Sequence, residues 1–201
     1  DVIIFRLEEE KFWVSTLYGK DLVKRYGWYI EDYDVAYEDL TKQIRMYAVQ
    51  GPKSPEVVNS IIDGSVDDMK YFNIKEDQVG KIPVHVARAG YTGEKFGYEI
   101  YVPVDCKEEI AAKIGEAAKA AGGMQVTEID VMAMTLPAEA GYYLMLDLRR
   151  CTPYEVGFDS MVDFKKDFVG KRALRKLSRK EPARELVGIE VPDYDAVIVG
   201  H

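Results

Sequence analysis

The feature that most constrains the fold is a strand–loop–strand pattern over residues 87–103, in which glycines at positions 90, 93 and 97 separate two apolar runs. Because glycine adopts backbone conformations closed to other residues, these glycines predict tight turns and a loop that a bound ligand approaches closely. Glu99 lies between Tyr98 and Ile100 in the second run, so strand alternation predicts that it faces away from both neighbours. A carboxylate held in this way accepts two parallel N–H donors, such as the edge of a pterin or guanine-like ring.

The remaining pattern mixes strands and helices without a strict βαβ alternation, which predicts the α+β class with mixed or antiparallel sheets flanked by helices. The predicted strands cover residues 2–7 and 12–17, as a hairpin, then 43–49, 84–88, 98–102 and a strand from Leu186. The predicted helices cover residues 20–30, 54–63, 105–121 and 127–134, and residues 171–184 predict a basic, solvated helix face. Ser54 is expected to cap the second helix, with Pro55 at its first position.

Composition excludes several classes of function. The 201 residues carry a formal net charge of −8, which argues against a general nucleic-acid binder. No apolar run approaches the roughly 20 residues of a membrane span, so no membrane association is expected. Cys106 and Cys151 lack the spacing of a zinc or redox pair, so we expect no metal site and a reducing, cytoplasmic setting.

Several blocks in a fixed order resemble a known family. They are Asp1-Val-Ile-Ile-Phe-Arg-Leu7, Tyr47-Ala-Val-Gln-Gly-Pro-Lys-Ser54, the loop Gly90-Tyr-Thr-Gly-Glu94 with Glu99, Leu136-Pro-Ala-Glu-Ala-Gly141, Thr152-Pro-Tyr-Glu-Val-Gly157, Phe168-Val-Gly-Lys-Arg-Ala-Leu174 and Glu185-Leu-Val-Gly-Ile-Glu-Val191. Together they resemble the glycine-cleavage T-protein (aminomethyltransferase) family over almost the whole chain. The resemblance implies a folate-binding domain of two intertwined subdomains over residues 1–180, and the start of a C-terminal β-barrel over residues 181–201. It also implies a longer enzyme, with further segments before Asp1 and after His201.

The resemblance implies tetrahydrofolate as the cofactor and assigns roles to four residues. Glu99 would hold the pterin and Tyr91 would line the same pocket. Asp1 would be the catalytic residue, near the folate nitrogens that react. Glu139 keeps the family's acidic position and is expected to contribute to cofactor binding, whereas Pro137 stands where the family has an arginine. Without the resemblance, Glu99 reads as a solvent-facing strand carboxylate and Glu139 as a structural residue at a helix end.

The one-carbon donor stays open at this stage. The family resemblance implies either an aminomethyl group on a lipoylated carrier protein or a methyl group on a small-molecule donor, as in the O-, S- and N-demethylase relatives. Ser15, Thr16 and Leu17 stand where aminomethyltransferases typically carry an asparagine, and with Pro137 they favour a non-standard donor. The alternative from another class is a non-catalytic, folate-binding protein that acts in protein maturation such as iron–sulfur assembly.

Overall fold

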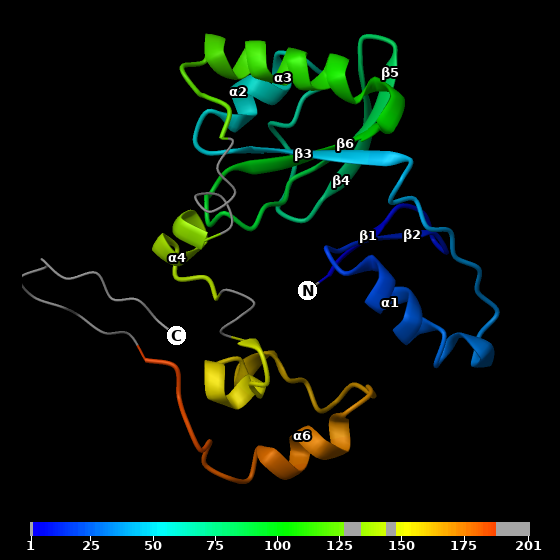
Figure 1. Ribbon diagram of the computed structural model, residues 1–201, viewed down its shortest axis with the longest axis vertical. Coiled ribbons are helices and arrows are strands. Elements are labelled where there is room, and N and C mark those ends of the chain that lie inside the picture. Colours follow the sequence, from blue (N-terminus) through cyan, green and yellow to red (C-terminus); the bar gives the residue numbers. More distant parts are fainter. Residues whose placement is uncertain (1, 127–133, 144–147, 188–201) are drawn as a thin grey trace, which may run out of the picture. The chain divides into compact units, whose positions relative to one another are not determined.

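The computed structural model of the protein describes residues 2–126, 134–143 and 148–187 (Figure 1). The chain forms two compact units, Asp1–Tyr142 and Tyr143–His201. No helix in the described part of the chain is long and apolar enough to cross a membrane. The residues that the sequence analysis places in the pterin pocket all belong to the first unit.

A four-stranded antiparallel sheet forms the centre of the first unit, with its strands in the order β3-β6-β5-β4 (Figure 1). The strands are β3 (Ile44–Gln50), β4 (Ile74–Val79), β5 (Ile82–Ala87) and β6 (Gly97–Pro103). Strand β6 is buried along almost its whole length, as expected of a central strand that is covered on both faces. Its register places Glu99 opposite Ala48 of β3 and Ala87 of β5, so this carboxylate starts from the interior of the sheet.

One face of the sheet packs against two helices, α2 (Ser54–Asn59) and α3 (Lys107–Ala120) (Figure 1). The helix α3 turns a stripe of apolar residues towards this face because they recur at helical spacing. Its Ile110 is fully buried, with Ile114, Ala117 and Ala118 packed around the same core. Tyr98 and Ile100 of β6 point into this core. The predicted helix over residues 105–121 and its apolar stripe are therefore confirmed.

The opposite face of the sheet packs against a β-hairpin of β1 (Ile3–Arg6) and β2 (Phe12–Ser15) (Figure 1). Phe5 is buried there with Ala87 and Tyr101, and Trp13 packs against the same cluster. The chain continues from the hairpin into the exposed helix α1 (Gly19–Tyr26) and the short 3-10 helix η1 (Ile30–Asp32). The predicted hairpin is confirmed, and it covers the face of the sheet from which Glu99 projects.

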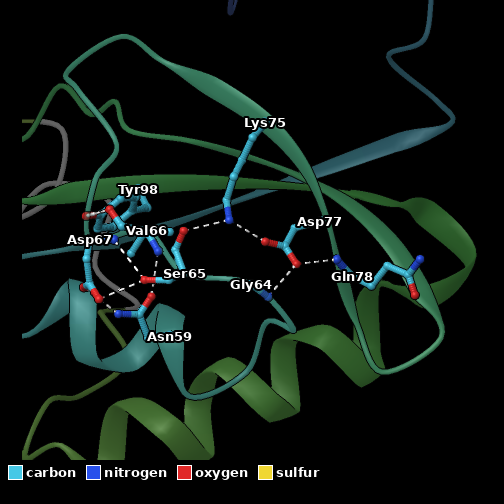
Figure 2. A network of polar contacts seen from close by, with 9 residues as sticks. All are labelled: Asn59, Gly64, Ser65, Val66, Asp67, Lys75, Asp77, Gln78 and Tyr98. Atoms are coloured by element: carbon cyan, nitrogen blue, oxygen red, sulfur yellow. Dashed lines mark hydrogen bonds and ion pairs between the residues drawn. The ribbon is translucent and has the colours of Figure 1, made fainter.

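A network of polar contacts joins the end of α2 to strand β4 (Figure 2). Asp77 accepts hydrogen bonds from the backbone N–H of Gly64 at 3.1 Å and of Gln78 at 2.8 Å, and pairs with Lys75 at 2.6 Å. Lys75 also donates to the carbonyl of Ser65 at 2.8 Å. These bonds hold in place the segment that leads from α2 into the loop before β4. The strand β4 was not predicted because the four polar residues at 75–78 show no apolar alternation.

The start of α2 differs from the prediction. Ser54 is the first helical residue rather than the cap, and Lys53 occupies the cap position without a side-chain hydrogen bond. The Ser54 hydroxyl is buried and has no hydrogen-bond partner among the described residues. The helix also ends at Asn59, before the predicted end at residue 63. A serine at this point therefore contributes a buried polar group instead of a cap.

Replacing this buried hydroxyl is expected to cost no stability. In urea unfolding, Ser54→Ala should leave the free energy of unfolding unchanged or raise it by up to about 1 kcal/mol, since an unpartnered buried hydroxyl is itself unfavourable. Ser60→Ala is the matched control, because the Ser60 hydroxyl donates to the Val57 carbonyl at 2.7 Å. That control should lose roughly 0.5–1.5 kcal/mol. Equal losses in both variants would contradict the assignment.

The second unit contains short helices: η4 (Pro153–Val156), η5 (Asp159–Met161) and α6 (Lys171–Leu177). Thr152 and Glu155 form a reciprocal capping box at the start of η4, and Gly157 ends the turn with φ +71°. The Glu155 carboxylate also accepts a hydrogen bond from Arg184 at 2.8 Å. The predicted helix over residues 127–134 falls mainly outside the described residues. So does most of the predicted strand that begins at Leu186.

The capping carboxylate makes the second unit sensitive to acid. The Thr152 backbone N–H and the Arg184 guanidinium lower the pKa of Glu155 from 4.5 to about 2. The bonds that lower this pKa stabilise the unit at neutral pH, and this contribution is lost as pH falls from about 4.5 towards 2. We expect Glu155→Gln to lower the stability of the unit at pH 7 and to flatten its acid dependence. Unfolding followed by circular dichroism between pH 7 and 3 tests this, with the exposed Glu181→Gln as control; parallel curves for wild type and Glu155→Gln would contradict it.

Candidate functional site

Glu99 is a buried carboxylate on the face of the sheet that the hairpin covers. Its side chain projects opposite Tyr98 and Ile100, as strand alternation predicted, and only 2% of the residue is exposed. The Tyr101 hydroxyl, two residues further along the same strand, donates a hydrogen bond to Glu99 Oε2 at 2.6 Å. The other oxygen, Oε1, has no hydrogen-bond partner among the described residues. Glu99 is therefore not a solvent-facing strand carboxylate, and its Oε1 atom is available to accept a hydrogen bond from a ligand.

Burial dominates the electrostatics of this carboxylate. Removal from water raises the pKa of Glu99, and the hydrogen bond from Tyr101 opposes that rise. The Tyr101 phenol has a raised pKa for the same reason, first because of burial and then because it donates to Glu99. An acid in this setting interacts strongly with any N–H donor that reaches it, because the surroundings screen the charge poorly.

Two further tyrosines lie close enough to Glu99 to feel its charge. Burial raises the pKa of Tyr91, and the charge of Glu99 raises it further. Burial is also the main cause of the raised pKa of Tyr71, with smaller contributions from Tyr142 and Glu99. Tyr91 is 39% exposed and Tyr71 is 44% exposed, so both rings keep surface for contact with a ligand. The charge of Glu99 thus acts on the predicted residue Tyr91 and on Tyr71, which was not predicted.

Contacts of Tyr71 and of the neighbouring Phe72 hold Tyr71 near the glycine loop. Its hydroxyl donates to the Gly90 carbonyl at 3.3 Å, and its ring lies 4.3 Å from that of Phe72. The Phe72 N–H donates to the Arg88 carbonyl at 2.9 Å, while Phe72 itself has the left-handed φ of +64° that non-glycine residues rarely adopt. These contacts hold Tyr71 against the start of the glycine loop.

The loop glycines serve packing inside the protein. A Cβ on Gly90 or Gly97 would lie 2.1 Å or 1.9 Å from the side-chain oxygen of Gln50. Gln50 Nε2 donates to the carbonyls of Ala89 at 3.2 Å and Tyr98 at 3.3 Å, and its oxygen accepts from Thr92. The spacing of the glycines predicted that a ligand approaches them closely. In the structure it is the Gln50 side chain that occupies this space and joins the two ends of the loop.

The helix α4 (Leu136–Glu139) lies against the glycine loop. A Cβ on Gly93, whose φ is +83°, would lie 1.9 Å from the Cβ of Ala140. Pro137 is buried in this helix, whereas Glu139 at its end is exposed. The structure thus places Glu139 on an element that contacts the loop, without a hydrogen bond to Glu99 or Tyr91 among the described residues. Asp1, the predicted catalytic residue, lies outside the described residues.

Two residues of this site were not predicted from the sequence. Tyr101 was detectable, because it shares a strand face with Glu99 at a spacing of two. Tyr71 gave no sequence signal, since it precedes an unpredicted strand and meets the site only through folding.

Comparison with known proteins identifies the group to which the chain is similar. An aminomethyltransferase of Thermoanaerobacter sp. (strain X514) is 31% identical over 204 residues, which cover 96% of this chain and 53% of that protein. An aminomethyltransferase of Clostridium botulinum (strain Kyoto / Type A2) is 35% identical over 226 residues, covering 100% of this chain and 58% of that protein. The chain thus spans about half the length of the curated relatives that it matches.

A protein-family model gives the assignment directly. The model described as the GCVT N-terminal domain matches residues 1–166, which include both strands of the hairpin, the whole central sheet and helix α4. This match takes in Glu99, Tyr91 and Glu139, and it covers well over half of the 201 residues. The chain belongs to the GCVT N-terminal domain family.

Proposed function

We propose that this chain is the folate-binding part of a tetrahydrofolate-dependent one-carbon transferase. The observation that carries the proposal is Glu99, a carboxylate that is 2% exposed, lies beside the glycine loop and has one oxygen without a partner among the described residues. Membership of the GCVT N-terminal domain family and the similarity to aminomethyltransferases support it.

The buried carboxylate fits one edge of the pterin ring. Two parallel N–H donors on that edge match the two oxygens of Glu99, and a charge-assisted pair of this kind is strong and directional. The rings of Tyr91 and Tyr71 would form walls beside the bound ring, because both keep exposed surface close to Glu99. Glu139, on the helix that contacts the loop, would contribute to binding from the rim.

Tetrahydrofolate supplies the nitrogen atoms that accept the one-carbon unit. The protein's part in that step is to hold the acceptor and to manage the proton that an amine loses on accepting a carbon. A positioned carboxylate performs this task, and we assign it to Asp1 on the strength of the family resemblance. Asp1 lies two residues before β1 in the sequence, and the β1–β2 hairpin covers the face on which Glu99 lies.

The relatives favour an aminomethyl group on a lipoylated carrier protein as the donor, since those that match are named aminomethyltransferases. A small methylated molecule is the second candidate, because Ser15 and Pro137 depart from the family pattern. Pro137 is buried in α4, so its side chain packs inside the protein. Because the relatives are named aminomethyltransferases, the aminomethyl donor leads.

A transfer assay with a panel of donors tests this function. The protein that carries this chain would be incubated with tetrahydrofolate and, in turn, with an aminomethylated lipoyl carrier, a methoxy-aromatic, a sulfonium and an N-methyl donor. We expect the one-carbon adduct of tetrahydrofolate to form with the carrier and to disappear in Glu99→Gln. Tight binding of tetrahydrofolate without transfer from any donor would instead identify a non-catalytic folate-binding protein. Absence of both binding and transfer would overturn the proposal.

A further inference from the structure

Tyr101 connects Glu99 to the β1–β2 hairpin. Its hydroxyl donates a hydrogen bond to Glu99 Oε2 at 2.6 Å, and its ring packs against Phe5 and Trp13 of the hairpin. Tyr101 and Glu99 lie on the same face of β6 because they are two residues apart. The hairpin thus acts on the buried carboxylate through the tyrosine against which it packs.

The ring of Tyr101 is fixed by its surroundings. It is 4% exposed, its centroid lies 5.0 Å from that of Trp13, and Phe5 meets it edge-on at 6.1 Å. Both neighbours belong to the hairpin. The hydroxyl of a phenol buried to this degree must find its hydrogen-bond partner within the protein. Glu99 is that partner. The position of the hairpin therefore fixes the direction of the bond that Glu99 receives.

This bond leaves Glu99 able to bind a ligand while restricting how it does so. An ionised carboxylate offers about four acceptor positions on two oxygens. Tyr101 occupies one position on Oε2, and the described residues leave Oε1 open. A carboxylate with one oxygen anchored presents a fixed plane, and a ring edge with two donors requires such a plane. The hydrogen bond from Tyr101 also favours the ionised form of Glu99, and this is the form that accepts N–H donors on both oxygens.

We propose that Tyr101 is a positioning residue for ligand binding by Glu99, and that the packing of the hairpin on its ring holds it in place. This inference rests on the proposed function, because it assigns the orientation of the carboxylate that would hold tetrahydrofolate.

Few titratable groups among the described residues face this site. Tyr101 donates to Glu99 from the same strand. The charge of Glu99 raises the pKa of Tyr91 and of Tyr71, which lie on neighbouring loops. On β5, His85 lies opposite Tyr101 in the register and contacts Trp13 at 4.9 Å; burial lowers its pKa, and exposed Glu76 opposes this. The three phenols are neutral at pH 7, so removal of the Tyr101 hydroxyl isolates one donor without changing the charge.

Tyr101→Phe is the test, because it removes the hydroxyl and keeps the ring against Trp13 and Phe5. Carbon-13 NMR of the side-chain carboxyl of Glu99, in the ligand-free chain, would follow its titration. We expect the midpoint to move to higher pH in Tyr101→Phe, since a donor to the ionised form is lost. Affinity for tetrahydrofolate, measured by calorimetry at pH 7, should fall about tenfold.

Tyr98→Phe is the matched control on the same strand. Its hydroxyl donates to the Val66 carbonyl at 3.5 Å on the helix-covered face, and the residue is 2% exposed. It should lose some stability and leave the Glu99 midpoint unchanged. An unchanged midpoint in Tyr101→Phe would overturn the positioning role. The titration needs no ligand, so a failure of the wild-type chain to bind tetrahydrofolate would refute the proposed function and still leave the NMR result to decide this inference.

Discussion

In calorimetric titrations, Glu99→Gln is expected to bind tetrahydrofolate about 30- to 1000-fold more weakly than the wild-type chain, which corresponds to roughly 2–4 kcal/mol. The substitution keeps the size of the side chain and removes its charge. It also replaces one acceptor oxygen by an NH₂ group, which would meet the ligand's own N–H donors. In a site where Glu99 is 2% exposed, water cannot take over the lost interaction.

The same variant should gain stability as it loses affinity. Burial raises the pKa of Glu99 above its value in the unfolded chain, so folding becomes less favourable as pH rises through that range and the carboxylate is forced to ionise. Glu99→Gln removes this penalty, and at pH 7 it should unfold at a higher urea concentration than wild type. Weaker binding by a more stable protein excludes unfolding as the cause.

Two observations check this prediction. Glu94→Gln removes a carboxylate from the exposed part of the same loop and should leave the affinity for tetrahydrofolate nearly unchanged. In the wild-type chain, affinity should fall as pH is lowered through the raised pKa of Glu99, and this dependence should be absent in Glu99→Gln. Equal affinities of wild type and Glu99→Gln at pH 7 would show that the ligand does not depend on this carboxylate.

Gly93→Ala is expected to lower the free energy of unfolding by about 2–4 kcal/mol. Two costs add: a left-handed backbone, with φ at +83°, that disfavours alanine, and a clash of the new methyl group with the Cβ of Ala140 at 1.9 Å. Neither cost is easily relieved, since both partners are short and attached to the backbone. Because Tyr91 lies two residues before Gly93, the affinity for tetrahydrofolate should fall as well.

Two further variants separate the costs of Gly93→Ala. Gly122→Ala measures the cost of the left-handed backbone without a clash. Gly122 has φ +81°, and no heavy atom of the described residues lies within 4 Å of an added Cβ. It should lose about 1–2 kcal/mol. Adding Ala140→Gly to Gly93→Ala should recover the contribution of the clash and leave a loss close to that of Gly122→Ala. If the double variant recovers no stability in urea unfolding, a clash between the loop and the end of α4 is not the cause of the loss.

Much of this fold follows from local patterns in the sequence. The alternation around Glu99 predicted which way the carboxylate faces, and the apolar stripe from Ile110 predicted the helix that covers the other side. Both are short-range signals that the antiparallel sheet preserves. The strand β4 was not predicted because its residues 75–78 are all polar. Its position is fixed by pairing with β5 and by the bonds of Lys75 and Asp77.

The site itself was only half predictable. Glu99 and Tyr91 came from a motif in one stretch of chain, whereas the groups that surround them come from separate elements. Tyr71 meets the loop across 19 residues, and Phe5 and Trp13 reach Tyr101 from the hairpin. The glycines illustrate the limit of local reasoning. Their spacing predicted an open approach for a ligand, but only the tertiary structure shows that Gln50 occupies the space beside Gly90 and Gly97.

The most direct test of the central claim is a crystal structure of the chain with tetrahydrofolate bound. We predict two N–H groups of the pterin edge at about 2.7–3.2 Å from the oxygens of Glu99, with the Tyr101 hydroxyl still donating to Oε2 and the pterin beside Tyr91. A pterin bound elsewhere, with Glu99 in contact with protein groups alone, would contradict the account.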